Sequence, residues 1–350
     1  MSMLGRFSHT PIGVDIGGYF IKAAQLSGSR RRWRVGAATC FQRANPGAPV
    51  EQKEVCRLSE VLRRQGFRGQ DAVVAVPPEM LLGGMLDLSS ADSEAPIEQA
   101  ARVELARVHG CDPQSFEMAC WVLPPSPRAK DQRQVLATAC RHSDADGLLD
   151  VLEGGGLNVL SLDSHARALQ RACGPLLKNS TGIVGILDVG WNTGQLFVLR
   201  QGSVIYQRVL PEAGLGRLVK ALAEALFLPP DELSLLLLGG GLEEEISRDG
   251  TESGEKLHDL ARAHFATALD DLQTPLLYAI QQHPGTAVQG MLLVGEGASI
   301  PGLAEYLSES VEIKTRAVER SDLPECVGSL PDGCSAAGLV LAIGLAQFFW

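Results

Sequence analysis

The fold is set by the N-terminal stretch Ile12-Gly-Val-Asp-Ile-Gly-Gly-Tyr-Phe-Ile-Lys-Ala-Ala-Gln-Leu26. In it, two apolar runs rich in β-branched residues flank the pair Gly17-Gly18. Apolar runs of this length, separated by glycines, are typical of two strands joined by a tight turn. Glycine permits a positive φ and lets other groups approach the backbone closely. The stretch therefore predicts a strand, a turn with exposed backbone N–H groups, and a second strand.

A second copy of this pattern follows later in the chain, in the sequence LDVGWNTGQLFVL at residues 187–199. Both copies have the order apolar, Asp, apolar, Gly, turn, strand. Asp15 corresponds to Asp188, and Gly17 corresponds to Gly190. An internal repeat of this kind indicates two related lobes that face a common cleft.

The chemistry of these turns points to an anionic ligand and a cation. Backbone N–H groups in a glycine turn form an anion-binding nest. An aspartate beside bound phosphate would repel it unless a cation intervened, so Asp15 and Asp188 predict Mg²⁺ held mainly through water. A third segment, LVGEGASIPGL at residues 293–303, reads as strand, glycine turn and helix, which would let a nucleotide lie against the backbone. Lys22 either reaches a phosphate or faces solvent from its strand.

Composition narrows the function classes. The chain has 350 residues with 31 Lys and Arg against 41 Asp and Glu, a net charge of −10, which argues against broad nucleic-acid binding. Its 45% hydrophobic and 21% charged residues are typical of a globular protein, and its length predicts two domains or one large two-lobed domain. The eight cysteines have no zinc-type spacing, and no signal peptide is evident, so we expect reduced thiols in a cytosolic protein.

The apolar stretch 335–350 is shorter than the roughly 20 residues of a membrane-spanning helix. It predicts a buried C-terminal helix, and a membrane-dipping tail is the alternative. In the middle of the chain, the order strand, helix, strand, strand, helix, strand predicts a compact α+β insertion.

The three glycine turns, in this order and spacing, resemble those of the actin/Hsp70/sugar-kinase superfamily. The two phosphate loops resemble residues 15–22 and 188–193, and the adenosine loop resembles residues 295–299. The connecting helices resemble residues 163–173 and 336–347. Within the superfamily the chain is most similar to the PilM family of type IV pilus assembly proteins, with cell-division FtsA as a cousin.

The resemblance covers residues 11–348, and the insertion is its most telling part. It implies an α/β, actin-like (ribonuclease H-like) two-lobed fold with an inserted α+β subdomain of the FtsA/PilM type. We therefore expect three units: a first lobe at 11–86 and 157–180, closed by the C-terminal helix 335–350; the inserted subdomain at 87–156; and a second lobe at 181–334.

The resemblance also implies a function. A PilM-like protein is a cytoplasmic adaptor, peripheral at the inner membrane, that binds ATP with Mg²⁺ in the interlobe cleft. It captures the N-terminal cytoplasmic peptide of a PilN-like bitopic membrane protein and links it to the pilus motor ATPases. Self-association is a further expectation, and nucleic acid is not an expected partner. Nucleotide would act as a conformational ligand, with hydrolysis weak or absent.

Site residues follow from the matched motifs. Mg²⁺ would be associated with Asp15 and Asp188. The nucleotide would contact Gly17, Gly18, Tyr19, Lys22, Gly190, Asn192, Thr193, Gly214, Gly295, Glu296, Gly297 and Ser299. Asp163 corresponds to the acid that orients the attacking water in the superfamily, and its alternative role is the N-cap of the helix that it begins.

Three features depart from the family pattern: the bulky Tyr19 and Trp191 in the phosphate loops, and Glu296 between the glycines of the adenosine loop. The nucleotide-binding adaptor is the main hypothesis, and these residues favour its first alternative, a nucleotide-free pseudo-ATPase scaffold. Two more functions are compatible with the same fold: an active ATPase or small-molecule kinase, and an adaptor of cell division or of a secretion system.

Overall fold

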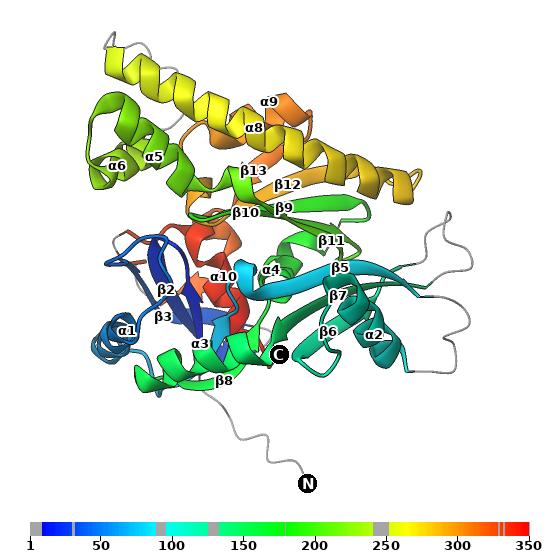
Figure 1. Cartoon of the computed structure of the whole chain (residues 1–350). Coiled ribbons are helices and arrows are strands. Elements are labelled where there is room, and N and C mark those ends of the chain that lie inside the picture. Colours follow the sequence, from blue (N-terminus) through cyan, green and yellow to red (C-terminus); the bar gives the residue numbers. More distant parts are fainter. Residues whose placement is uncertain are drawn as a thin grey trace.

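A computed structural model describes residues 9–29, 32–88, 96–124, 133–178, 180–240, 252–327, 330–331 and 333–349 (Figure 1). The strands are β1 (Ile12–Ile16), β2 (Phe20–Ser29), β3 (Arg32–Gln42), β4 (Asp71–Ala75), β5 (Leu81–Leu88), β6 (Phe116–Val122), β7 (Arg133–Arg141), β8 (Asn158–Asp163), β9 (Ile183–Val189), β10 (Gly194–Arg200), β11 (Ser203–Leu210), β12 (Val288–Val294), β13 (Thr315–Ala317) and β14 (Glu325–Cys326). The helices are α1 (Gln52–Arg64), α2 (Ile97–His109), α3 (His142–Gly154), α4 (His165–Cys173), α5 (Leu215–Leu226), α6 (Pro230–Gly240), α8 (Glu252–Gln282), α9 (Leu303–Val311) and α10 (Ala336–Ala346).

The first lobe is built on a six-stranded sheet with the order β14-β3-β2-β1-β4-β8. Helices α1 and α3 cover one face, where Val55, Leu58, Leu148 and Leu152 pack against apolar residues of β1, β2 and β4. Helix α10 covers the other face, in contact with β1, β2 and α4. Figure 1 shows this lobe at the lower left.

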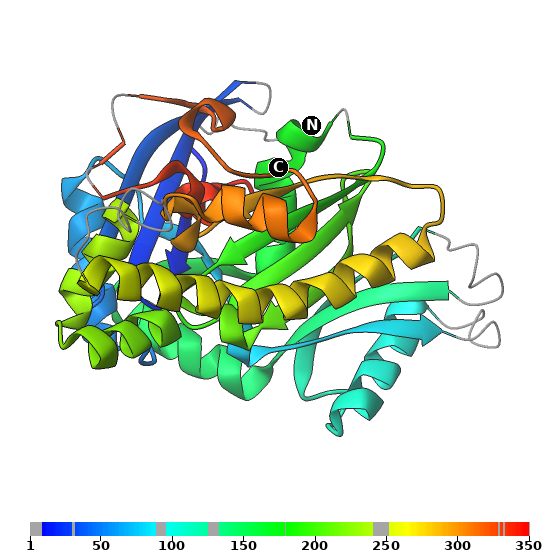
Figure 2. The ribbon, with the colours of Figure 1, turned by 90° about the horizontal axis from the view of Figure 1, so that it is seen from above.

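The second lobe is built on a five-stranded sheet with the order β11-β10-β9-β12-β13. The long α8 crosses this sheet diagonally, as Figure 2 shows from above. One extended core includes apolar residues of β9, β10, β12, α5 and α8. Both α5 and α8 have apolar residues at helical spacing, and their buried faces contribute Leu218 and Phe265 to this core.

The two sheets repeat the same pattern of strands, which confirms the predicted duplication. β1 pairs antiparallel with β2 and parallel with β4, and β9 pairs antiparallel with β10 and parallel with β12. Asp15 lies opposite Lys22 across the first pair, and Asp188 lies opposite Gln195 across the second. The repeat therefore places one aspartate and one polar partner at the same position in each lobe.

The inserted module is a three-stranded sheet with the order β5-β7-β6, covered by α2. Its bounds differ from the predicted 87–156. The sheet already begins with β5, which pairs along its whole length with β7. Helix α3 packs on α1, so its apolar residues belong to the first lobe rather than to the module. The chain also returns to the first lobe before the predicted residue 335, because β14 pairs with β3.

The apolar C-terminal stretch forms the predicted buried helix. All residues of α10 from Ala337 to Ala346 are buried, and the Ser335 side chain caps the helix by accepting a hydrogen bond from Gly338 N at 3.0 Å. A Cβ on Gly13 would lie 2.0 Å from Ala342 O, so the helix packs directly on the backbone of β1. Among the described residues, no helix is long and apolar enough to cross a membrane.

Candidate functional site

Four charged residues meet where the two lobes face each other. Asp15 and Lys22 come from the first lobe, whereas Asp188 at the end of β9 and Glu296 after β12 come from the second. Lys22 Nζ lies 3.0 Å from Asp15 Oδ2 and 3.3 Å from Glu296 Oε1. The three side chains are 6–8% exposed. A single lysine therefore joins a carboxylate of each lobe in a dry environment.

The charge states of this cluster follow from burial and pairing. Burial alone would lower the pKa of Lys22, but the carboxylates of Asp15 and Glu296 outweigh it and raise that pKa, so the lysine is charged. Burial raises the pKa of Glu296, and Lys22 opposes this shift. The second carboxylate oxygen of Glu296, Oε2, is buried and has no hydrogen-bond partner among the described residues. Glu296 is thus held by its contact with Lys22.

Loop 1 (residues 17–19) is fixed by the first lobe. The Gly18 carbonyl accepts a hydrogen bond from Gly47 N at 2.7 Å, and the Gly17 carbonyl accepts one from Arg43 Nη1 at 3.3 Å. Arg43 is itself held in a buried two-point ion pair with Glu54, at 2.8 and 3.3 Å. Loop 1 is therefore positioned before any ligand binds.

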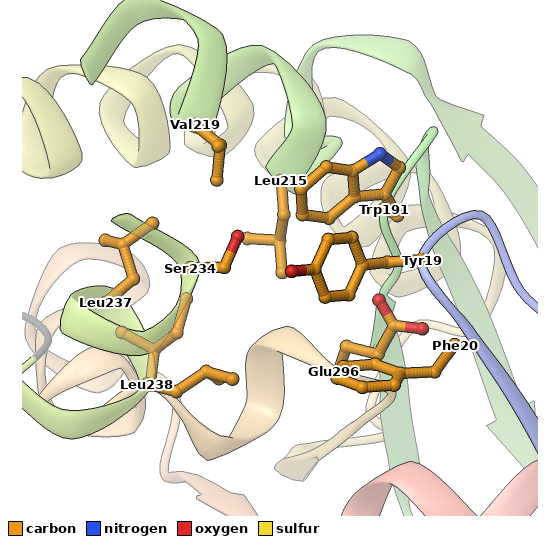
Figure 3. A pocket seen from close by; sticks show the side chains of 10 residues that line it. Tyr19, Phe20, Trp191, Leu215, Val219, Ser234, Leu237, Leu238 and Glu296 are labelled. Carbon is orange, nitrogen blue, oxygen red and sulfur yellow. The ribbon is translucent and has the colours of Figure 1, made fainter. Parts of the chain in front are cut away.

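Loop 1 also contacts loop 2 (residues 190–193) directly across the lobes. The rings of Tyr19 and Trp191 stack with centroids 4.2 Å apart and planes 29° apart (Figure 3). A Cβ on Gly18 would lie 2.6 Å from Asn192 Oδ1. A side chain at this position would have to displace Asn192 and Trp191, so glycine here permits the close contact between the two loops.

Loop 2 uses the hydrogen-bond donors at the start of α5. Leu215 N donates to Gly190 O at 3.1 Å, and Gly216 N donates to Trp191 O at 2.9 Å. A Cβ on Gly214 would lie 2.3 Å from Asn192 O. These helix N-terminal amides would be suited to bind phosphate, but here they are bonded to loop 2. Thr193 ends the loop, and its carbonyl oxygen lies 2.8 Å from where a Cβ on Gly190 would be.

Loop 3 (residues 295–299) is packed against the end of β9. Gly295 has φ +84°, and a Cβ on it would lie 2.2 Å from Asp188 Oδ1. A Cβ on Gly297 would lie 2.3 Å from Val189 Cγ1. Ser299 N donates to Glu296 O at 3.3 Å inside the loop. The predicted adenosine loop thus packs closely against the strand that carries Asp188.

Asp163 at the end of β8 is bonded within the first lobe. Its Oδ2 pairs with Arg171, and its Oδ1 accepts from Ser164 N at 2.8 Å. The N-cap of α4 is Ser164, whose side chain accepts from Arg167 N, so the capping role proposed for Asp163 belongs to the next residue. The water-orienting role of Asp163 stays a prediction.

Two polar residues that we did not predict lie beside Asp188. His165 Nδ1 is 3.7 Å from Asp188 Oδ2, and Gln195 Nε2 is 2.5 Å from the same ring nitrogen. Gln195 occupies the position that Lys22 has in the first copy of the repeat. Aligning the two copies residue by residue would have identified it.

A small apolar cavity lies beside the stacked rings (Figure 3). Residues of α5, α6 and the loops line it, among them Leu215, Val219, Leu237 and Leu238. Its volume is about 20 Å³, which is enough for roughly one water molecule. A nucleoside cannot enter this cavity unless the surrounding residues move. A second cavity, of about 640 Å³, is lined by the same two rings together with Gly216, Lys220 and Glu224.

As arranged here, the groups predicted to contact the phosphates of ATP and Mg²⁺ are bonded within the protein. Lys22 on β2 is bonded to two carboxylates, the α5 amides are bonded to loop 2, and aromatic rings bridge the lobes. Among the described residues, no group of three or more His, Cys, Asp and Glu side chains is arranged to hold a metal ion. Binding of ATP and Mg²⁺ therefore stays a prediction, and it requires rearrangement of this cleft.

Comparisons with known proteins agree with this architecture. The sequence model of the family "Type IV pilus assembly protein PilM" matches residues 13–226. The structure is similar to that of a PilM-PilN type IV pilus biogenesis complex, with a TM-score of 0.76, 20% identity and 98% of each chain covered.

More distant structures share the fold. The ethanolamine utilization protein EutJ from Carboxydothermus hydrogenoformans has a TM-score of 0.54 at 16% identity, covering 97% of this chain and 89% of EutJ. MreB5 of Spiroplasma citri bound to AMPPNP has a TM-score of 0.54 at 10% identity, covering 96% and 95%. The chain has the actin-like ATPase fold and belongs to the PilM family of type IV pilus assembly proteins.

Proposed function

We propose that this protein is an assembly adaptor that captures an extended peptide from the cytoplasmic N-terminus of a PilN-like inner-membrane partner. Membership of the PilM family supports a role in pilus assembly, and a PilM relative forms a complex with PilN. The observation that carries the proposal is a groove between two sheets of this chain.

The groove has a volume of about 360 Å³ and lies between the inserted module and the second lobe. One wall is β5, the edge strand of the three-stranded sheet, and the opposite wall is β11, the edge strand of the second lobe's sheet. The start of α4, with Ser164 and His165, also lines it. Edge strands carry unpaired backbone N–H and C=O groups, so both walls offer hydrogen bonds to an extended chain.

The side chains in the groove suit such a peptide. Gly84 leaves the backbone of β5 open to close approach, whereas at Gly83 the carbonyl oxygen already lies 3.2 Å from His109 Nε2. Met85 and Val209 add apolar surface from the two walls, and Val209 is 42% exposed. Addition of a strand to an exposed sheet edge is a common mode of peptide recognition, with side-chain pockets giving specificity. We infer that an apolar, extended segment binds here.

The test compares peptide binding by two variants in which valines of similar solvent exposure are replaced, one inside the groove and one outside it. A labelled peptide with the partner's N-terminal sequence is titrated with the wild type, with Val209→Glu in the groove, and with Val122→Glu. Val122 is 47% exposed on β6, outside the groove. We expect Val209→Glu to weaken binding about tenfold or more, or roughly 1.4 kcal/mol, and Val122→Glu to bind like the wild type. Equal binding by all three proteins would refute this location.

We further propose that the adaptor works without ATP or Mg²⁺; the pairing of Lys22 with two carboxylates and the stacked rings across the cleft support this. Such an adaptor would be a nucleotide-free pseudo-ATPase scaffold. Contacts with motor ATPases, self-association, and a cytoplasmic location at the inner membrane through the partner stay predictions.

A further inference from the structure

Among the residues that the structure describes, Glu296 is the carboxylate that crosses from the second lobe to the lysine of the first. Its Oε1 lies 3.3 Å from Lys22 Nζ. It also lies against loop 1, because a Cβ on Gly17 would be 3.0 Å from the same oxygen. The carboxylate therefore occupies the point where the lysine and the first glycine turn converge, which is where the sequence predicts a phosphate.

Glu296 is poorly satisfied for a buried charge. Only one of its oxygens has a partner, and Oε2 is buried without one among the described residues. A buried charge with an unsatisfied oxygen contributes little to stability. Its contact with Lys22 of the other lobe points instead to a role in closing the lobes.

The local charge opposes a polyphosphate. Asp15, Asp188 and Glu296 place three carboxyl groups in this cluster against the single lysine Lys22, so acidic groups outnumber basic ones. An entering phosphate would have to displace Glu296 from Lys22 and remain beside the other two carboxylates.

We propose that Glu296 acts as a built-in substitute for a nucleotide phosphate: it binds Lys22 across the cleft, holds the lobes together, and excludes phosphate ligands. The stacked rings of Tyr19 and Trp191 give a second contact between the lobes. This inference goes beyond the proposed adaptor function, since peptide capture in the groove does not depend on Glu296.

The test measures ligand binding rather than activity. Inorganic pyrophosphate and Mg-ATP are titrated separately, by calorimetry, into the wild type, Glu296→Ala, Glu296→Gln and Glu325→Ala. Glu325 is a matched control, because it pairs with Arg34 and is 71% exposed on β14, on the edge strand of the first lobe's sheet. The double variant Lys22→Met/Glu296→Ala tests whether any gained affinity uses the lysine.

We expect no saturable binding to the wild type or to Glu325→Ala at millimolar ligand. Glu296→Ala should gain at least about tenfold in affinity, and the double variant should lose this gain. Glu296→Gln keeps the size of the side chain, so it replaces the alanine variant if circular dichroism shows that the latter is unfolded. Equal binding by wild type and Glu296 variants would overturn the proposal, as would failure of both folded Glu296 variants to bind either ligand. Peptide titration of the same samples tests the adaptor function independently.

Discussion

Replacing Lys22 by methionine removes the positive charge between Asp15 and Glu296 while keeping most of the side-chain volume. At an effective dielectric constant of about 20, each contact near 3 Å is worth roughly 5 kcal/mol before desolvation is subtracted. Breaking a buried ion pair from one side typically costs about 3–5 kcal/mol, because a buried charge is left without a partner. We expect Lys22→Met to lower the free energy of unfolding by an amount in this range.

The assay is urea unfolding at neutral pH, followed by circular dichroism, of the wild type, Lys22→Met, Glu296→Gln and the double variant. In the Glu296→Gln background the lysine faces one carboxylate fewer, so its removal should cost less, with a coupling energy of roughly 0.5–3 kcal/mol. Lys53→Met is the control: Lys53 also pairs with a glutamate, at 2.7 Å, but is 66% exposed, so we expect no measurable change. The cross-lobe pairing would be refuted if Lys22→Met lowered the free energy of unfolding equally with Glu296 and with Gln at position 296, or did not lower it in either case.

Two further predictions concern the loops. Gly295→Ala should destabilise the protein by much more than Gly285→Ala. Both glycines have a positive φ (+84° and +82°), which costs an alanine about 1–2 kcal/mol at either position. Only at Gly295 would the new Cβ also collide with Asp188 Oδ1. Thermal unfolding compares them, and equal losses would mean that loop 3 does not pack on β9. Burial would raise the pKa of Glu54, but its bonds with Arg43 lower it overall. The ionised Glu54 therefore stabilises the folded protein above its unfolded-state pKa of 4.5, and this stabilisation is lost as the pH falls through its lower folded-state pKa. The difference in unfolding free energy between the wild type and Glu54→Gln should therefore narrow below pH 4.5. A gap unchanged down to about pH 3 would contradict this assignment.

Much of the fold could be predicted because the spacing of apolar residues and glycines determines the local secondary structure. The apolar runs around Gly17-Gly18 and their copy at 187–199 specify a strand, turn and strand in each lobe, and the sheets are built on them. The apolar stretch at the C-terminus specified a buried helix, α10. Helix α6 was missed, although Pro230 at its first position is a known start signal.

The site depended on contacts that local pattern does not encode. Tyr19 and Trp191 each stood out as bulky, but only tertiary structure brings them into a stack. Glu296 stood out as a departure from the family, yet its partner Lys22 lies 274 residues away in sequence. The placement of α3 in the first lobe likewise depends on its packing with α1, which strand and helix order cannot reveal.

The most direct test of the account is the affinity of the partner's N-terminal peptide with and without Mg-ATP. Calorimetric titration of wild-type protein, in parallel buffers that differ only in millimolar Mg-ATP, gives both values. A cleft already closed by Lys22, Glu296 and the stacked rings predicts the same affinity within about twofold. Peptide binding that appears only with Mg-ATP, or strengthens about tenfold or more with it, would contradict the account.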